Sequence, residues 1–313
     1  MNLPRTSLLL PLVAAALAGC SGSTKGSTTA EVQPRVAITD TNAVQAAACA
    51  WHAAFLPVRI LKIATAFLEL PSLIPTAGPG QPAPTPTQPI VNPEVQTVAG
   101  PEGGSAIRTW DDVDGDQRYS SGDRFTVAFS AWGESGLALD GVVVFRDLVI
   151  TGDLIDGLSW RLDVQIDLIG IGCSVNGNDT TLNGSVAVHR EKRATVRTMD
   201  VQLSQDLRLG VDVVQAGSTM ARNEYVLDFT MGLFAEGRVF DPVLGGELEF
   251  AHDAPLTGLS VFADPMFGSF VVKGGGAAIL TLVPTDMFNA ELHFDADGDE
   301  VVEQVFPVEY ASF

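Results

Sequence analysis

The feature that most constrains the fold is the alternation of apolar and polar side chains along most of the C-terminal part of the chain. From residue 160 to residue 168, tryptophan, leucine, valine and isoleucine occupy every even position, and arginine, aspartate and glutamine occupy every odd one. The same period of two recurs over 125–129, 199–213 and 225–233. Such side chains point alternately to the two faces of a β-strand. Residues 106–313 are therefore predicted to form a β domain.

Short turn sequences separate the predicted strands. They are Asn176-Gly177-Asn178-Asp179, Asn183-Gly184, Gly245-Gly246, Gly274-Gly275-Gly276 and Asp297-Gly298. Asn-Gly, Asp-Gly and Gly-Gly pairs favour tight hairpins. Consecutive strands joined by tight hairpins form an antiparallel meander. The expected fold class is mainly β, as a sandwich, an open barrel or a curved sheet.

One helix is expected before the β domain, over residues 41–70. Alanine, the strongest helix former, dominates this stretch, and Asp40, Thr41 or Asn42 can act as the N-cap. Pro57 removes a backbone donor and should kink or split the helix. Because charged residues are sparse here, the helix should pack on the β domain.

Residues 71–105 contain nine of the 18 prolines of the chain. Proline favours extended polyproline II structure and is excluded from sheet interiors. This stretch is predicted to be a linker or a long surface loop, outside the sheet.

The chain carries 38 acidic and 18 basic residues and has a formal net charge of −20. A surface of this charge repels nucleic acid and attracts divalent cations, so no nucleic-acid partner is expected.

The first residues have the pattern of a signal peptide. Arg5 precedes an apolar run over residues 7–17, which is shorter than the ~20 residues that span a bilayer. The run ends in Leu17-Ala18-Gly19-Cys20, which resembles the lipobox of bacterial lipoproteins. The resemblance implies removal of residues 1–19, lipid modification of Cys20 and a membrane anchor. Residues 20–40, rich in serine, threonine and glycine, are predicted to be a flexible tether.

The resemblance also bears on location and activity. In this family, aspartate directly after the cysteine retains the protein in the inner membrane. Here Ser21 follows Cys20, so the outer membrane is the implied destination. The whole pattern resembles uncharacterised β-rich lipoproteins of Gram-negative bacteria, which implies no activity.

Two cysteines remain once Cys20 is assigned to lipidation. Cys49 and Cys173 are an even pair for an oxidising compartment, so a disulfide between them is one expectation. The other is a pair of buried thiols that act as small apolar side chains.

Two acidic stretches have the spacing of calcium loops. In the first, acids stand at positions 1, 3, 5 and 12, with a backbone carbonyl at 7 and a hydroxyl at 9: Asp112, Asp114, Asp116, Asp123, Arg118 and Ser120. Calcium takes about six to eight oxygen ligands, which such a loop can supply. The stretch resembles EF-hand and dockerin loops, although Gln117 stands where the EF-hand has glycine.

The second stretch follows a predicted strand near the C-terminus. Its candidate ligands are Asp295, Asp297, Asp299, the carbonyl of Val301, and Glu303. The spacing resembles the short calcium loops of integrin-type propellers, with Glu300 in place of the usual glycine. Each of the two stretches is also compatible with an acidic hairpin turn that holds no metal. Repulsion between close aspartates favours a bound cation, and its expected role is structural.

No catalytic constellation is visible, and no enzyme is predicted. The histidines do not cluster, and there is no Gly-x-Ser-x-Gly elbow or phosphate-binding loop. The expected function is that of a lipid-anchored structural or interaction module, with an envelope protein as partner. The alternative is a periplasm-facing protein that binds an apolar ligand such as lipid, with Trp132, Trp160, Phe229, Phe262 and Phe294 as cavity lining. The sequence leaves the oligomeric state open.

Overall fold

The structure of the chain is a computed structural model, and it describes residues 34–70 and 92–310. Within the second range the description omits 117–118, 135, 155–156, 176–177, 195, 204–207, 210–211, 227–228 and 259–265. Side chains are also omitted at 175–178, 195–234 and 258, where only the backbone is used. The predicted signal peptide, Cys20 and most of the predicted tether and linker lie outside these residues.

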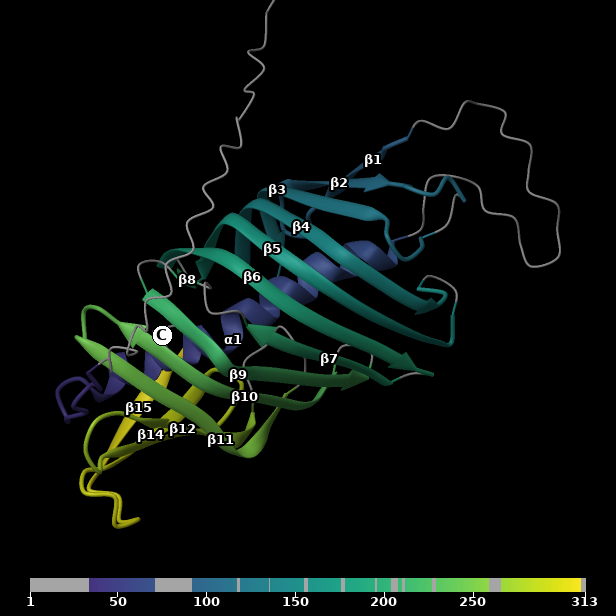
Figure 1. The fold of residues 1–313 in the computed structure, drawn as a ribbon. Coiled ribbons are helices and arrows are strands. Elements are labelled where there is room, and N and C mark those ends of the chain that lie inside the picture. The colour runs from purple at the N-terminus through teal and green to yellow at the C-terminus, as the bar shows by residue number, and fades with distance from the viewer. Residues whose placement is uncertain are drawn as a thin grey trace, which may run out of the picture. The chain divides into compact units, whose positions relative to one another are not determined.

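The described chain forms one helix and a long antiparallel meander (Figure 1). The helix α1 (Ala43–Ala66) is followed by a single 3-10 turn, η1 (Phe67–Glu69). The strands are β1 (Glu94–Ala99), β2 (Ser105–Asp111), β3 (Arg124–Glu134), β4 (Leu137–Gly152), β5 (Ser159–Val175), β6 (Asn178–Arg193), β7 (Val196–Leu203), β8 (Arg208–Leu209), β9 (Asp212–Val226), β10 (Phe229–Asp241), β11 (Gly246–Gly258), β12 (Phe267–Lys273), β13 (Ile279–Pro284), β14 (Asn289–Asp295) and β15 (Gln304–Glu309).

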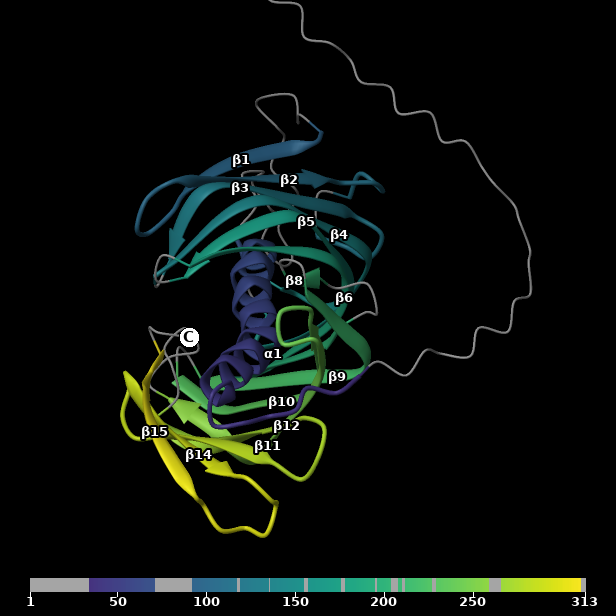
Figure 2. The same cartoon turned by 90° about the vertical axis from the view of Figure 1, so that its left-hand side faces the viewer.

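The strands pair in chain order into one sheet that runs from β1 to β15, with the short β8 beside β6 and β9. The sheet curves around α1, which lies on its concave side (Figure 2). This confirms the predicted mainly β fold, its antiparallel meander and the single helix packed on it. Of the three arrangements expected, the curved sheet is the one observed.

Alternation explains the strands locally. In β3, Phe125, Val127 and Phe129 are buried, and the residues between them are only partly buried. In β14, Ala290 and Leu292 are buried in the same way. The dry face of each strand thus contributes to one core beneath the curve of the sheet.

Helix α1 is buried on nearly all sides from Ala50 onward. Trp51 packs against Phe270 and Tyr310, and Phe67 packs against Phe129. The helix therefore contacts strands from both halves of the meander. By length and composition alone, Ala43–Glu69 is apolar enough to cross a membrane, but 67% of its apolar window is buried inside the protein. Within the described residues it is a core helix.

The chain before α1 is attached to the sheet. Residues 34–38, here called the N-terminal strap, form parallel bridges from Arg35 to Glu247 and from Ala37 to Gly275. The Val36 amide donates to the Glu247 carbonyl at 3.1 Å, and the Gly275 amide donates to the Val36 carbonyl at 2.6 Å. Within the predicted tether, residues 20–40, the described strap is therefore attached to the sheet and is not a free linker. The backbone partners of the strap lie far along the chain, so a local sequence pattern does not record this docking.

Asn42 occupies the N-cap position, as expected, but its side chain does not cap the helix. Its Oδ1 accepts from the Thr39 amide at 2.8 Å, and its Nδ2 donates to the Ala37 carbonyl at 3.0 Å. Asn42 therefore fixes the turn between the strap and α1. The helix continues through Pro57 as one element and is not split.

Two buried arginines from the sheet bind the end of the helix. Arg108 of β2 donates to the Leu70 carbonyl at 2.8 Å and pairs with Glu94 at 2.6 Å. Arg190 of β6 donates to the Thr65 carbonyl at 3.1 Å and pairs with Glu69 at 2.5 Å. The last turn of α1 has no basic residue of its own. The two arginines from the sheet therefore donate hydrogen bonds to carbonyls at the helix end and interact favourably with the helix dipole.

Several predicted boundaries are wrong. The stretch 71–105, predicted as linker, contains all of β1, because an edge strand flanked by prolines needs few ladder donors. Asn183-Gly184, predicted as a turn, lies inside β6, opposite a bulge in β5. There the Asn183 Oδ1 accepts from the Gly170 amide at 2.6 Å. The run 199–213 is divided among β7, β8 and β9.

Candidate metal centres

The first acidic loop connects β2 to β3. Asp112, Asp114 and Asp116 each place a carboxylate oxygen so that these atoms lie within 4.8 Å of one another. The Asp112 Oδ1 accepts from the Gly115 amide at 2.8 Å, and Gly115 has a φ of 74°. This left-handed turn, which glycine adopts freely, lets the chain fold back over the first aspartate. The three residues could hold a metal ion.

The other predicted ligands of this loop have different positions. Ser120 donates through its hydroxyl to the Asp114 Oδ2 at 3.2 Å, so it borders the group. The buried Asp123 accepts from the Trp110 indole at 2.9 Å, from the Ser120 amide at 3.0 Å and from the Val113 amide at 3.1 Å. Asp123 thus closes the loop and is not among the converging carboxylates. Arg118 lies outside the described residues.

This loop is tied to the helix end and to β1. The Tyr119 hydroxyl donates to the Leu70 carbonyl at 2.9 Å and accepts from Arg108 at 2.5 Å. Asn92 exchanges two hydrogen bonds with the backbone of Asp112, at 2.9 and 3.1 Å. Burial raises the pKa of Tyr119 to about 12, so the hydroxyl stays protonated as a donor. Tyr119 is not among the residues predicted for this site. Its only signal was an aromatic residue inside an acidic loop.

The second acidic loop connects β14 to β15. Asp295, Asp297, Asp299 and Glu303 bring one carboxylate oxygen each to within 4.8 Å of the others. The Asp295 Oδ1 accepts from the Gly298 amide at 2.6 Å, and Gly298 has a φ of 76°. The first and fourth positions of the two loops thus have the same geometry. These four residues could also hold a metal ion.

Glu300 departs from the usual loop pattern and has a φ of 72°. For a residue with a Cβ this left-handed conformation costs roughly 1–2 kcal/mol. The Glu300 amide nevertheless donates to the Asp295 Oδ2 at 2.9 Å, and the Val301 amide donates to the Asp299 Oδ1 at 2.9 Å. The loop therefore keeps the expected path without the expected glycine.

The two loops differ in electrostatics. In the first, a hydrogen bond from the Asp116 amide lowers the pKa of Asp114. In the second, repulsion from the Asp299 carboxylate raises the pKa of Asp297. The second loop therefore carries a charge repulsion that a bound cation would relieve.

No disulfide joins Cys49 and Cys173 in this structure, so the expected bridge between them is not formed. Cys173 lies on β5 and donates to the carbonyl of Thr180, its cross-strand partner, at 3.6 Å. Burial raises the pKa of the Cys173 thiol to about 12, which makes it unreactive at neutral pH. Cys20 lies outside the described residues.

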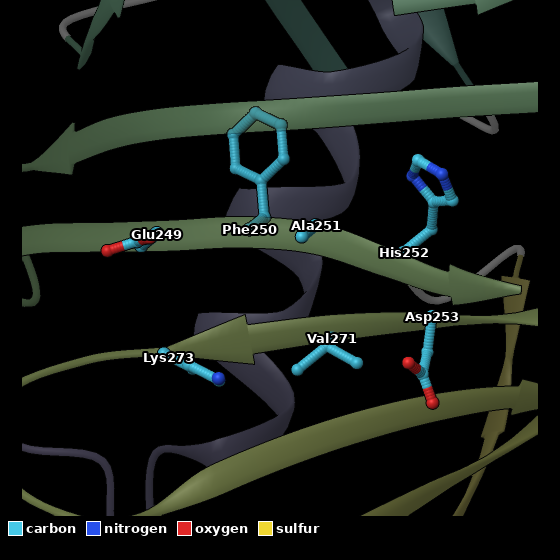
Figure 3. Close-up of a pocket in the computed structure, with 7 residues that line it drawn as sticks. All are labelled: Glu249, Phe250, Ala251, His252, Asp253, Val271 and Lys273. Carbon is cyan, nitrogen blue, oxygen red and sulfur yellow. The ribbon is translucent and has the colours of Figure 1, made fainter. Parts of the chain in front are cut away.

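A depression of about 160 Å³ lies on β11 and β12 (Figure 3). Its lining residues are Glu249, Phe250, Ala251, His252, Asp253, Val271 and Lys273. Glu249 pairs with Arg35 of the N-terminal strap at 3.1 Å, and Phe250 belongs to the core. Figure 3 shows α1 behind both strands. Neither of the two acidic loops contributes a residue to the lining of this depression.

Comparisons with protein-family models, with curated proteins and with solved structures find no match for this chain.

Proposed function

We propose that this protein is a lipid-anchored module of the outer membrane whose β domain is stabilised by calcium at two acidic loops. The role is structural or interactive, without catalysis. The observation that carries the metal part is that all the carboxylates chosen by spacing except Asp123 converge within their loops, with oxygens within 4.8 Å of one another. The lipobox ending in Cys20 supports the anchor.

Calcium fits the ligand chemistry of both loops. The converging groups are carboxylates, and no histidine or cysteine of the described residues joins them. Oxygen-only sets favour calcium or magnesium over zinc. Two short loops whose carboxylates are exposed except at the first aspartate of each suit the flexible coordination of calcium better than the strict octahedron of magnesium. Because both loops close hairpins of the same sheet, a bound ion would restrain strand pairs.

Calorimetry and thermal unfolding test the metal part. Calcium sites of extracellular modules have dissociation constants of about 0.1–1 mM, so 10 mM calcium should add about 1.4–2.7 kcal/mol per site. We expect calcium uptake by calorimetry and a melting temperature that falls with EDTA. Magnesium at the same concentration is the control. An unchanged melting temperature without calcium uptake refutes this part.

The anchor has a separate test. In Cys20→Ala the attachment point is lost, so the protein should leave the membrane fraction. Globomycin, which blocks removal of lipoprotein signal peptides, should cause the uncleaved precursor to accumulate. A wild-type protein that fractionates as soluble contradicts the anchor and leaves the calcium proposal intact.

We do not extend the proposal to an apolar ligand. Trp132 packs against Phe67, and Trp160 lies beneath Arg190, with 5.4 Å between the guanidinium carbon and the ring centre. Phe294 belongs to the buried core. Trp132 and Trp160 are thus packed against the helix end and its anchoring arginine, and Phe294 is part of the core. Phe262 lies outside the described residues, as does the side chain of Phe229.

A further inference from the structure

One end of strands β10–β15 combines exposed valines with the point where the N-terminal strap reaches the sheet. This entry end consists of the turn 242–245 and the loops 274–278 and 296–303. Val243 is 76% exposed, Val301 is 59% exposed and Val302 is 43% exposed. These three branched side chains place apolar atoms in contact with water at this end of the sheet.

Contacts with the strap place the three connections side by side. The Glu247 amide, just after the turn, donates to the Pro34 carbonyl at 2.7 Å. In the next loop, the Gly275 amide donates to the Val36 carbonyl. A Cβ at Gly298 of the third loop would lie 2.6 Å from the Ala277 carbonyl oxygen, so the second and third loops touch. The strap therefore brings the upstream chain to this end.

Chain length connects this end to the proposed anchor. Residues 20–33 are 14 residues, which span at most about 50 Å when fully extended. Neighbouring hairpin ends lie about 10 Å apart, so the whole entry end is only about 20 Å wide. A lipid on Cys20 would thus hold the entry end within reach of the membrane surface.

We infer that the entry end is a membrane-contact surface, where Val243, Val301 and Val302 meet the headgroup region of a phospholipid bilayer. The inference rests on the proposed function, since it needs the anchor and the calcium loop. Asp297, Asp299 and Glu303 lie beside the valines and repel lipid phosphate when no cation is present. Calcium in this loop would offset that charge and let phosphate oxygens complete its coordination. The contact should therefore depend on calcium.

Fluorescence from a dye at Val302→Cys tests the contact. The full chain is placed in vesicles of phosphatidylethanolamine and phosphatidylglycerol, with and without brominated lipid as a quencher. Leu158→Cys is the matched control, because Leu158 is 78% exposed but lies between β4 and β5, away from the entry end. Dye-treated wild type gives the background from Cys49 and Cys173, since the sulfur of Cys20 carries the lipid in the anchored protein. Calorimetry on the same samples measures calcium uptake.

With calcium, we expect the emission at position 302 to shift to the blue and lose intensity to brominated lipid. EGTA should reverse both effects, and position 158 should show neither. Calcium uptake without quenching at 302, or equal quenching at 158, overturns the contact and leaves the proposed function standing. Quenching at 302 without calcium uptake refutes the calcium site of the proposed function and, with it, the calcium dependence of the inferred contact. Val243→Cys gives a second reading if the loop variant misfolds.

Discussion

Replacing Arg108 should destabilise the protein more than any change to a surface ion pair. The Arg108 side chain is 0% exposed and that of Glu94 is 6% exposed, with 2.6 Å between the paired atoms. In Arg108→Met the Glu94 carboxylate stays buried and loses this ion pair, which costs about 3–5 kcal/mol. Loss of the cation at the helix C-terminus adds about 0.3–1 kcal/mol. At about 2–4 °C per kcal/mol for a chain of this size, the melting temperature should fall by about 7–24 °C.

Urea unfolding gives the free energy, and two comparisons show whether the buried charge is responsible. Arg35→Met breaks an exposed pair with Glu249, which is worth at most about 1 kcal/mol. Adding Glu94→Gln to Arg108→Met removes the stranded charge, so the double variant should be more stable than the sum of the single losses requires. Hydrogen exchange should show faster exchange in the last turns of α1. A loss below about 1 kcal/mol in Arg108→Met would refute the reasoning, because it would mean that the helix end does not depend on this cation.

Three further predictions concern the loops and the N-terminal strap. The charge of the neighbouring Asp299 raises the pKa of Asp297. Protonated Asp297 therefore adds to the stability of the fold at acidic pH, and this contribution is lost as the pH rises through that pKa. In EDTA at pH 7, Asp297→Asn should therefore melt no lower than wild type, yet gain less from calcium; a lower melting temperature in EDTA would contradict this. In Gly274→Ala the new Cβ would lie 2.1 Å from the Val36 carbonyl oxygen, which should cost about 1–3 kcal/mol in urea unfolding. Gly172→Ala, whose nearest atom lies at 3.8 Å, is the control and should stay within about 0.5 kcal/mol; equal losses would exclude docking of the strap. Glu300→Gly should raise stability by about 1 kcal/mol because it releases a left-handed residue, and calorimetry should show unchanged calcium affinity.

Much of the fold was predictable from residue pattern. A period of two is a local property of a strand, so 160–168 and 125–129 were recognised without knowledge of their partners. The acidic groups were also predictable, because the spacing of aspartates in one loop is itself local. Both cases need only a few consecutive residues.

Features that depend on distant partners were not predictable. In β2 the alternation is inverted in polarity: Arg108 is buried and Ile107 is 43% exposed. The carbonyls that satisfy Arg108 belong to the helix end, about forty positions earlier, and nothing near residue 108 reports them. Asn183-Gly184 carries a turn signal but lies in a strand, because a bulge across the ladder uses the asparagine side chain. Tertiary contacts therefore decide the exposure of Ile107, the burial of Arg108 and the conformation of Asn183-Gly184.

The placement of α1 has a consequence for the order in which the molecule can be assembled. The helix is synthesised first among the described elements, yet residues such as Trp51 pack against Phe270 and Tyr310, near the other end of the chain. Until those residues emerge, one of the most apolar stretches of the protein has no surface on which to fold. Contacts this distant in sequence slow folding and prolong exposure to aggregation. The newly made chain must therefore be kept from misassociating until its last strands are available.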